Sequence, residues 1–195
     1  EKFDWRKAEA ALNRFPQFKA DIGGQEIHFI HVKGSGSAPQ ALILTHGWPG
    51  SVYEFLDVIE PLAHPGKFGG NAEDGLDIVV PSLPGYGFSG KPEKPVGPRA
   101  TAALWDRLMR EVLGYRTYIA QGGDWGSVVS GYLGYDHSPA KGGGCKAIHL
   151  NMYGVRPAVL PETEAEQQWA AGAAMTFELE SAYLRLQMTK PQTLS

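Results

Sequence analysis

The chain has 195 residues, of which 43% are hydrophobic and 20% are charged, a composition typical of a globular domain with a buried core. Eighteen basic and 21 acidic residues give a net charge of −3, which gives no indication of nucleic-acid binding. A single cysteine, Cys145, excludes an intrachain disulfide and favours a reducing compartment.

The sequence carries no targeting signal that we can identify. No apolar run approaches the roughly 20 residues that a membrane-spanning helix needs, and no signal-peptide pattern is visible. The first residue is Glu1 rather than Met. We therefore expect a cytoplasmic protein, and we leave open membrane association through a preceding segment.

Hydrophobic patterns predict helices and strands that alternate along most of the chain. In chain order we expect a helix over residues 2–13, a strand over 25–33, a strand over 41–45, a helix over 52–63, a strand over 76–81, a helix over 101–113, a strand over 118–121, a helix over 126–135 and a strand over 147–151. This alternation is typical of βαβ units, so the fold class is α/β with a mostly parallel sheet. The first helix has Trp5, Ala8 and Leu12 on one face, so we expect it to pack on another element.

The character of the sequence changes after residues 156–157, where strand patterns stop. Thr163 and Glu166 have the spacing of a capping box, which predicts the start of a helix. That helix continues through Trp169 towards Met188, and Pro191 ends it because the residue before proline avoids the helical region.

Residues 122–126 have the outline of a nucleophile elbow, G-x-Nu-x-G, directly after a predicted strand. Glycines flank the turn because a side chain there would collide with the neighbouring strand and helix. The central residue is Asp124, whose carboxylate has an unperturbed pKa of roughly 3.9 and can attack saturated carbon without a base. Alternatively, Asp124 caps the next helix, since aspartate is a favourable N-cap residue.

A second loop, residues 46–51, follows another predicted strand. In such a sheet this loop supplies one backbone N–H of an oxyanion hole, and the residue after the nucleophile supplies the other. Those residues are Trp48 and Trp125. The alternative is an ordinary tight turn between strand and helix. We interpret His46 as structural, hydrogen-bonded to the loop backbone rather than transferring protons.

The remaining motifs predict no metal and no cofactor. His28 and His31 lie three residues apart in a strand, so they face opposite sides of it. No cysteine or histidine cluster has metal-ligand spacing. The glycines of the elbow lack both nucleotide-binding patterns, G-x-G-x-x-G and G-x-x-x-x-G-K-[ST].

Four spaced motifs resemble those of a known enzyme family. They are HGWPGS at residues 46–51, GYGFS at 85–89, GGDWGS at 122–127 and HLNM at 149–152. In this order they are similar to the microsomal-type epoxide hydrolases of the α/β-hydrolase superfamily. The resemblance implies three segments: an N-terminal extension at 1–33, the first half of an α/β-hydrolase core at 34–155, and the beginning of a helical cap at 156–195.

The resemblance also implies a mechanism. Asp124 would attack an epoxide carbon to form an alkyl ester, and the backbone N–H groups of Trp48 and Trp125 would stabilise the tetrahedral intermediate when water cleaves that ester. Tyr183 matches one of two cap tyrosines that hydrogen-bond the epoxide oxygen; its alternative is a helix tyrosine that packs on the core. The expected substrate is a small apolar epoxide, with water, in a pocket of aromatic residues: Trp48, Phe88, Trp125 and Tyr153.

The family's general-base histidine, its supporting acid and its second cap tyrosine all follow the cap. None of the six histidines here matches that base. A half sheet and half cap would expose much apolar surface, so we expect the C-terminal half as a second chain or as a segment omitted from this sequence. A homodimer is left open.

Two other functions remain as alternatives. A haloalkane dehalogenase shares the aspartate nucleophile and the fold but releases halide. A catalytically silent α/β-hydrolase-like binding protein would lack the base altogether.

Overall fold

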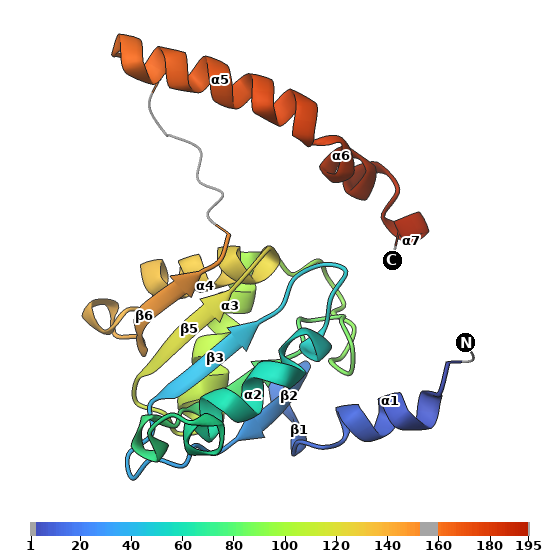
Figure 1. Cartoon of the computed structure of the whole chain (residues 1–195), viewed down its shortest axis with the longest axis vertical. Helices are drawn as coiled ribbons and strands as arrows, with labels where there is room; N and C mark the ends of the chain where they lie inside the picture. The colour runs from blue at the N-terminus through green and yellow to red at the C-terminus, as the bar shows by residue number, and fades with distance from the viewer. Residues whose placement is uncertain (1–2, 153–159, 195) are drawn as a thin grey trace. The chain divides into compact units, whose positions relative to one another are not determined.

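The structure is a computed structural model that describes residues 3–152 and 160–194. The chain divides into two compact units, Glu1–Tyr153 and Gly154–Ser195 (Figure 1). Among the helices of these described residues, none is both long enough and apolar enough to cross a membrane.

The first unit contains a six-stranded sheet. Its strands are β1 (Gln17–Ile22), β2 (Gln25–Val32), β3 (Ala41–Thr45), β4 (Asp77–Pro81), β5 (Tyr118–Gly122) and β6 (Cys145–Leu150), in the order β1-β2-β4-β3-β5-β6. The four strands from β4 to β6 in that order pair in parallel, whereas β1 and β2 pair antiparallel. The predicted α/β class with a mostly parallel sheet is confirmed.

Strand β1 is absent from the sequence prediction, which places no strand before residue 25. It forms a hairpin with β2, and Ile22 pairs with Gln25 across the turn. Gly23 and Gly24 make that turn with φ of +66° and +88°. Two glycines between β-forming runs are a hairpin signal, so the sequence did contain the information.

The described residues of the first unit also form helices. They are α1 (Trp5–Leu12), η1 (Val52–Phe55), α2 (Leu56–Ala63), η2 (Pro65–Phe68), η3 (Ala72–Asp74), α3 (Pro98–Arg107), η4 (Leu108–Val112), α4 (Trp125–Asp136) and η5 (Pro139–Lys141). Helix α3 begins three residues before its predicted start because Pro98 occupies the first helical position, where its missing N–H costs nothing. Helix α1 packs less than expected, since Trp5 is 54% exposed.

Two apolar clusters lie on the two faces of the sheet, because side chains alternate along each strand. Ala41 and Ile43 of β3 belong to the cluster that α3 and α4 cover, whereas Leu42 and Leu44 belong to the cluster that α2 covers (Figure 1). Trp105 of α3 is fully buried, and its indole N–H donates to Thr45 Oγ1 at 3.1 Å. This bond holds α3 against the end of β3.

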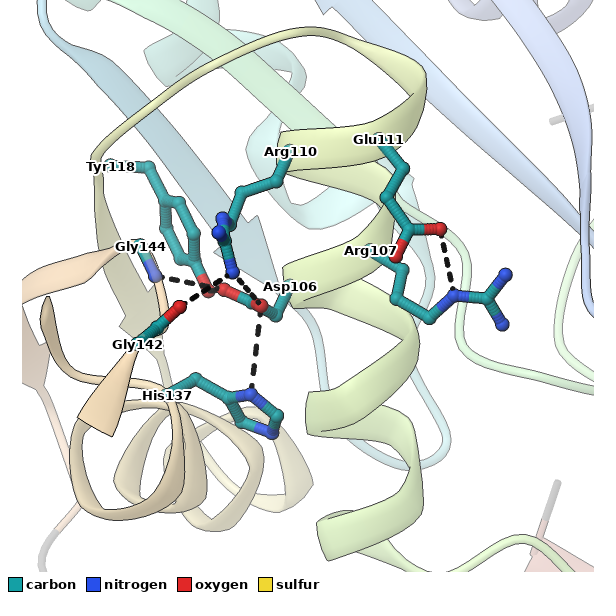
Figure 2. Close-up of polar contacts among 8 residues, drawn as sticks. All are labelled: Asp106, Arg107, Arg110, Glu111, Tyr118, His137, Gly142 and Gly144. Atoms are coloured by element: carbon teal, nitrogen blue, oxygen red, sulfur yellow. Dashed lines mark hydrogen bonds and ion pairs between the residues drawn. The ribbon is translucent and has the colours of Figure 1, made fainter.

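A buried carboxylate, Asp106 of α3, joins the helix to the starts of β5 and β6 (Figure 2). It accepts hydrogen bonds from the Tyr118 hydroxyl at 2.8 Å, the Gly144 N–H at 3.1 Å and Arg110 at 3.2 Å. His137 Nδ1 lies 3.6 Å from the same carboxylate. Burial, and then the bond to Asp106, raise the pKa of Tyr118, so its hydroxyl stays a donor.

The described residues of the second unit, 160–194, form the helices α5 (Glu164–Glu180), α6 (Ala182–Thr189) and α7 (Pro191–Leu194). The predicted capping box is confirmed: Thr163 Oγ1 accepts from the Glu166 N–H at 3.2 Å, and Glu166 accepts from the Thr163 N–H at 2.9 Å. The prediction of one helix towards Met188 was wrong, because Ser181 leaves the helical conformation (φ −88°, ψ 8°) and separates α5 from α6.

Candidate active site

The candidate site lies at the carboxyl ends of β3 and β5, which are neighbours in the sheet. After β3 the chain turns into η1 and α2 on one face, and after β5 it turns into α4 on the other. Ligands of open α/β sheets bind at such a switch point, in the crevice outside the strand ends. Two loops meet there, residues 46–51 and the elbow at 122–126.

The elbow is as tightly packed as its glycines predict. A Cβ on Gly122 would lie 2.1 Å from the carbonyl oxygen of Gly126, and a Cβ on Gly126 would lie 1.9 Å from that of Thr45. Asp124 itself has φ +50° and ψ −125°, and of the non-glycine residues that the structure describes it alone has a positive φ. Such a backbone costs about 1–3 kcal/mol, and strain of this kind concentrates at functional sites.

The Asp124 carboxylate contacts the second loop rather than its own helix. The Trp48 N–H donates to Asp124 Oδ1 at 2.9 Å. Asp124 occupies the N-cap position of α4 but makes no side-chain capping bond. The helix-cap alternative therefore does not describe what this carboxylate does. Trp125 follows as the first residue of α4, where N–H groups have no acceptor within the helix.

His46 has the structural role that we predict from the sequence. It is buried, and its Nδ1 donates to the carbonyl of Gly47 at 2.9 Å while its Nε2 accepts from the Leu83 N–H at 3.1 Å. Burial lowers the pKa of His46, which keeps the ring neutral in this bonded form. With both ring nitrogens occupied by the backbone, His46 is a loop anchor and not a proton carrier.

A cavity of about 240 Å³ adjoins the elbow on the side of α3 and α4. Its lining is mostly apolar: Leu83, Pro84, Tyr86, Val96, Gly97, Pro98, Thr101, Trp125 and Val129. Tyr86 was not predicted, although it lies in the GYGFS motif; burial and the charge of Asp124 raise its pKa.

The predicted pocket residues have different positions in the structure. Trp125 lines the cavity. Phe88 does not; it is 52% exposed and stacks edge-on against His28 at 5.1 Å between ring centroids. Trp48 is half-buried and contributes its backbone N–H. Tyr153 lies outside the described residues.

Tyr183 belongs to α6 of the second unit, where it is 65% exposed. It lines a groove of about 620 Å³ within that unit, together with Trp169, Phe177 and Leu184. The predicted bond from Tyr183 to an epoxide oxygen stays a prediction.

The paired histidines of β2 have separate partners. His28 bonds Ser82 Oγ at 2.9 Å and Gln17 Oε1 at 2.8 Å, and burial, with the nearby Lys19 charge, lowers its pKa to about 4. His31 Nε2 bonds the Tyr115 hydroxyl at 2.8 Å. Within residues 3–152 and 160–194, no group of three or more potential metal ligands comes together.

Comparison with known proteins gives a consistent result. Residues 1–55 match the family described as epoxide hydrolase N terminus, and residues 40–177 match the alpha/beta hydrolase fold. Epoxide hydrolase 1 of Sus scrofa is 36% identical over 98% of this chain and 46% of its own length.

Two solved structures are also similar over nearly the whole chain. The epoxide hydrolase of Aspergillus niger superposes with a TM-score of 0.76 at 35% identity, over 100% of this chain and 50% of that one. The juvenile hormone epoxide hydrolase of the silkworm Bombyx mori gives 0.72 at 31% identity, over 99% and 44%. The chain thus spans about half the length of these relatives. It belongs to the α/β-hydrolase fold family, with the N-terminal region that is characteristic of epoxide hydrolases.

Proposed function

We propose that this chain is the nucleophile-bearing half of an epoxide hydrolase, which converts an epoxide and water into a vicinal diol. The observation that carries the proposal is the position of Asp124. Its carboxylate is exposed on a strained elbow, bonds the N–H of Trp48 and does not cap its helix. The similarity to epoxide hydrolases over the whole chain supports the same reaction.

In the first step, Asp124 Oδ2 attacks an epoxide carbon, a carbon–oxygen bond of the ring breaks, and the product is an ester and an alkoxide. Tyr183 donates a proton to that alkoxide when the cap is in place. Oδ1 becomes the carbonyl oxygen of the ester.

In the second step, water adds to the ester carbon, and negative charge develops on Oδ1. The N–H groups of Trp48 and Trp125 stabilise that charge, as an oxyanion hole does. The intermediate then collapses, releases the diol and restores the carboxylate. The water must lose a proton, and we assign that step to a histidine in the C-terminal half. The proton that the histidine takes from water then restores the Tyr183 phenolate to the phenol, which closes the cycle.

The apolar lining of the 240 Å³ cavity supports an apolar epoxide as substrate. We propose that the C-terminal half, either continuous with this chain or a separate one, supplies the base, its supporting acid and the second tyrosine. The two competing functions predict different products. A haloalkane dehalogenase would release halide, and a silent binding protein would release nothing.

Replacement of the nucleophile tests the proposal in the full-length enzyme. With styrene oxide as probe, the wild type should release diol, and Asp124→Ala should release none above the uncatalysed rate. A chlorinated alkane should give no halide with either protein. Diol formation by Asp124→Ala at the wild-type rate would overturn the assignment.

A further inference from the structure

A second carboxylate lies beneath the loop that contacts Asp124. Glu54 belongs to η1, and its side chain folds back over Gly50, because a Cβ on Gly50 would lie 1.5 Å from Glu54 Oε1. The backbone N–H groups of Gly47 and Ser51 act to lower the pKa of this carboxylate. The Glu54 carboxylate therefore lies against the loop near its beginning and near its end.

Gly47 is the point where the surrounding groups converge. Its N–H is the group that acts most strongly to lower the pKa of Glu54, and its carbonyl accepts from His46 Nδ1 at 2.9 Å. A Cβ at this position would lie 2.4 Å from the Cβ of Asp124, so the Asp124 side chain packs directly against the glycine. The following N–H, that of Trp48, donates to Asp124 Oδ1.

These contacts determine the direction of the Trp48 N–H. The carbonyl of Gly47 and the N–H of Trp48 belong to one planar peptide unit and point in opposite directions. With His46 holding that carbonyl, and Glu54 lying against the preceding N–H, the peptide unit has little freedom to rotate.

The local structure of η1 does not require Glu54. Ser51 already caps this short helix, since its Oγ accepts from the Tyr53 N–H at 3.2 Å. Partial burial raises the pKa of Glu54, and the charge of Asp124 raises it further, while the loop N–H groups act in the opposite direction. A carboxyl perturbed by burial and by a like charge beside a candidate site is a functional candidate.

We propose that Glu54 is a positioning residue for ester hydrolysis, which holds the N–H groups of Gly47 and Ser51 and so keeps the Trp48 N–H aimed at Asp124 Oδ1. This inference rests on the proposed function. Glu54 does not touch the reacting atoms. It acts on the second step, because the ester carbonyl is neutral and negative charge returns to Oδ1 when water adds.

The test is rapid-quench mass spectrometry of the full-length enzyme with styrene oxide, following the ester on the peptide that contains Asp124. Glu54→Ala should slow ester hydrolysis by about 10- to 100-fold, the range for a misplaced oxyanion donor. Ester formation should change far less, so the ester accumulates. Glu54→Gln keeps an acceptor oxygen and should hydrolyse the ester within about threefold of the wild-type rate, since neutral hydrogen bonds are weaker.

Glu111→Ala is the matched control, because Glu111 is an exposed carboxylate that pairs with Arg107 on α3, away from the loop. The amplitude of ester formation counts folded sites, so a folding defect lowers the amplitude and leaves the rates unchanged.

Three results would overturn a claim. If Glu54→Ala hydrolyses the ester as fast as the wild type, Glu54 has no positioning role. If Glu54→Gln is slowed as much as Glu54→Ala, the acceptor oxygen is not what matters. If the wild type forms diol without any ester on Asp124, the proposed function itself fails and takes this inference with it.

Discussion

Asp106 and Asp124 are both aspartates near β5, and they differ in burial and in the number of hydrogen-bond donors around the carboxylate. Asp106 precedes the strand, is buried, and accepts bonds from Tyr118, Gly144 and Arg110 (Figure 2). Asp124 follows the strand and is exposed. Within the described part of the chain, its side chain accepts one hydrogen bond, from the Trp48 N–H.

The backbone conformations of Asp106 and Asp124 also differ. Asp106 lies in the regular helix α3, whereas Asp124 has φ +50°. A carboxylate with its lone pairs occupied by donors contributes to stability and is a poor nucleophile. A strained carboxylate with one donor costs stability and keeps an oxygen available for attack. The comparison predicts that replacing Asp124 lowers activity without lowering stability, and that replacing Asp106 lowers stability without lowering activity.

The largest expected effect is the loss of activity in Asp124→Gly. Turnover should fall by about 10⁴-fold or more, as it does when a catalytic nucleophile is removed. The same change should raise the free energy of unfolding by about 1 kcal/mol, because glycine relieves the positive-φ strain. Urea unfolding checks the second part, and a destabilised Asp124→Gly would contradict the strain argument.

Asp106→Ala should show the opposite pattern. Three donors would lose their buried acceptor, so the free energy of unfolding should fall by about 3 kcal/mol. The activity of the fraction that remains folded should be unchanged. A stability within about 0.5 kcal/mol of the wild type would show that the network is dispensable.

Tyr118→Phe sharpens this prediction by removing one donor and leaving the ring. The loss should be about 1.5–3 kcal/mol, because a hydrogen bond to a charged acceptor contributes that much. Urea unfolding of the single and double variants with Asp106→Ala should give less than additive losses. Additive losses would mean that the two groups do not act through one bond.

Low pH should destabilise the fold through His28. Its pKa in the folded protein is about 4, below the unfolded value near 6.5, so the neutral form is favoured by folding. The contribution is present above pH 6.5 and is lost as the pH falls from 6.5 to about 4. The urea midpoint should decrease in this window, and His28→Gln should decrease less steeply.

The smallest effect is expected for Glu111→Gln. The ion pair with Arg107 is solvent-exposed, with the atoms 3.0 Å apart (Figure 2). Exposed pairs of this kind contribute about 0.5 kcal/mol or less. A loss as large as that of Tyr118→Phe, measured in the same urea titrations, would remove the distinction between the buried network and the surface pair.

The sequence predicts the strand, turn and helix around Asp124 because the elbow is a local feature, and the clash at Gly122 involves Gly126 of the same turn, whereas the clash at Gly126 involves the distant residue Thr45. The strand order and the partner of the Asp124 carboxylate depend on contacts between distant segments. The Trp48 bond joins residues 76 positions apart, and only the motif pattern pointed to it.

Other features were missed for similar reasons. Tyr86, rather than Phe88, lines the cavity, since alternate residues of a glycine-rich loop can point either way. Glu54 looks like an ordinary surface acid until its side chain is seen to fold over Gly50. The hairpin of β1 follows from Gly23 and Gly24 at its turn, whereas the break at Ser181 is a local backbone change that the helical pattern does not indicate.

A single turnover in H₂¹⁸O tests most directly whether Asp124 is a covalent nucleophile. Full-length enzyme in excess over styrene oxide should give a first diol without solvent label, and the ¹⁸O should appear in the carboxylate of the peptide that contains Asp124. Label in the first diol, with none in that peptide, would show direct attack by water and contradict the account.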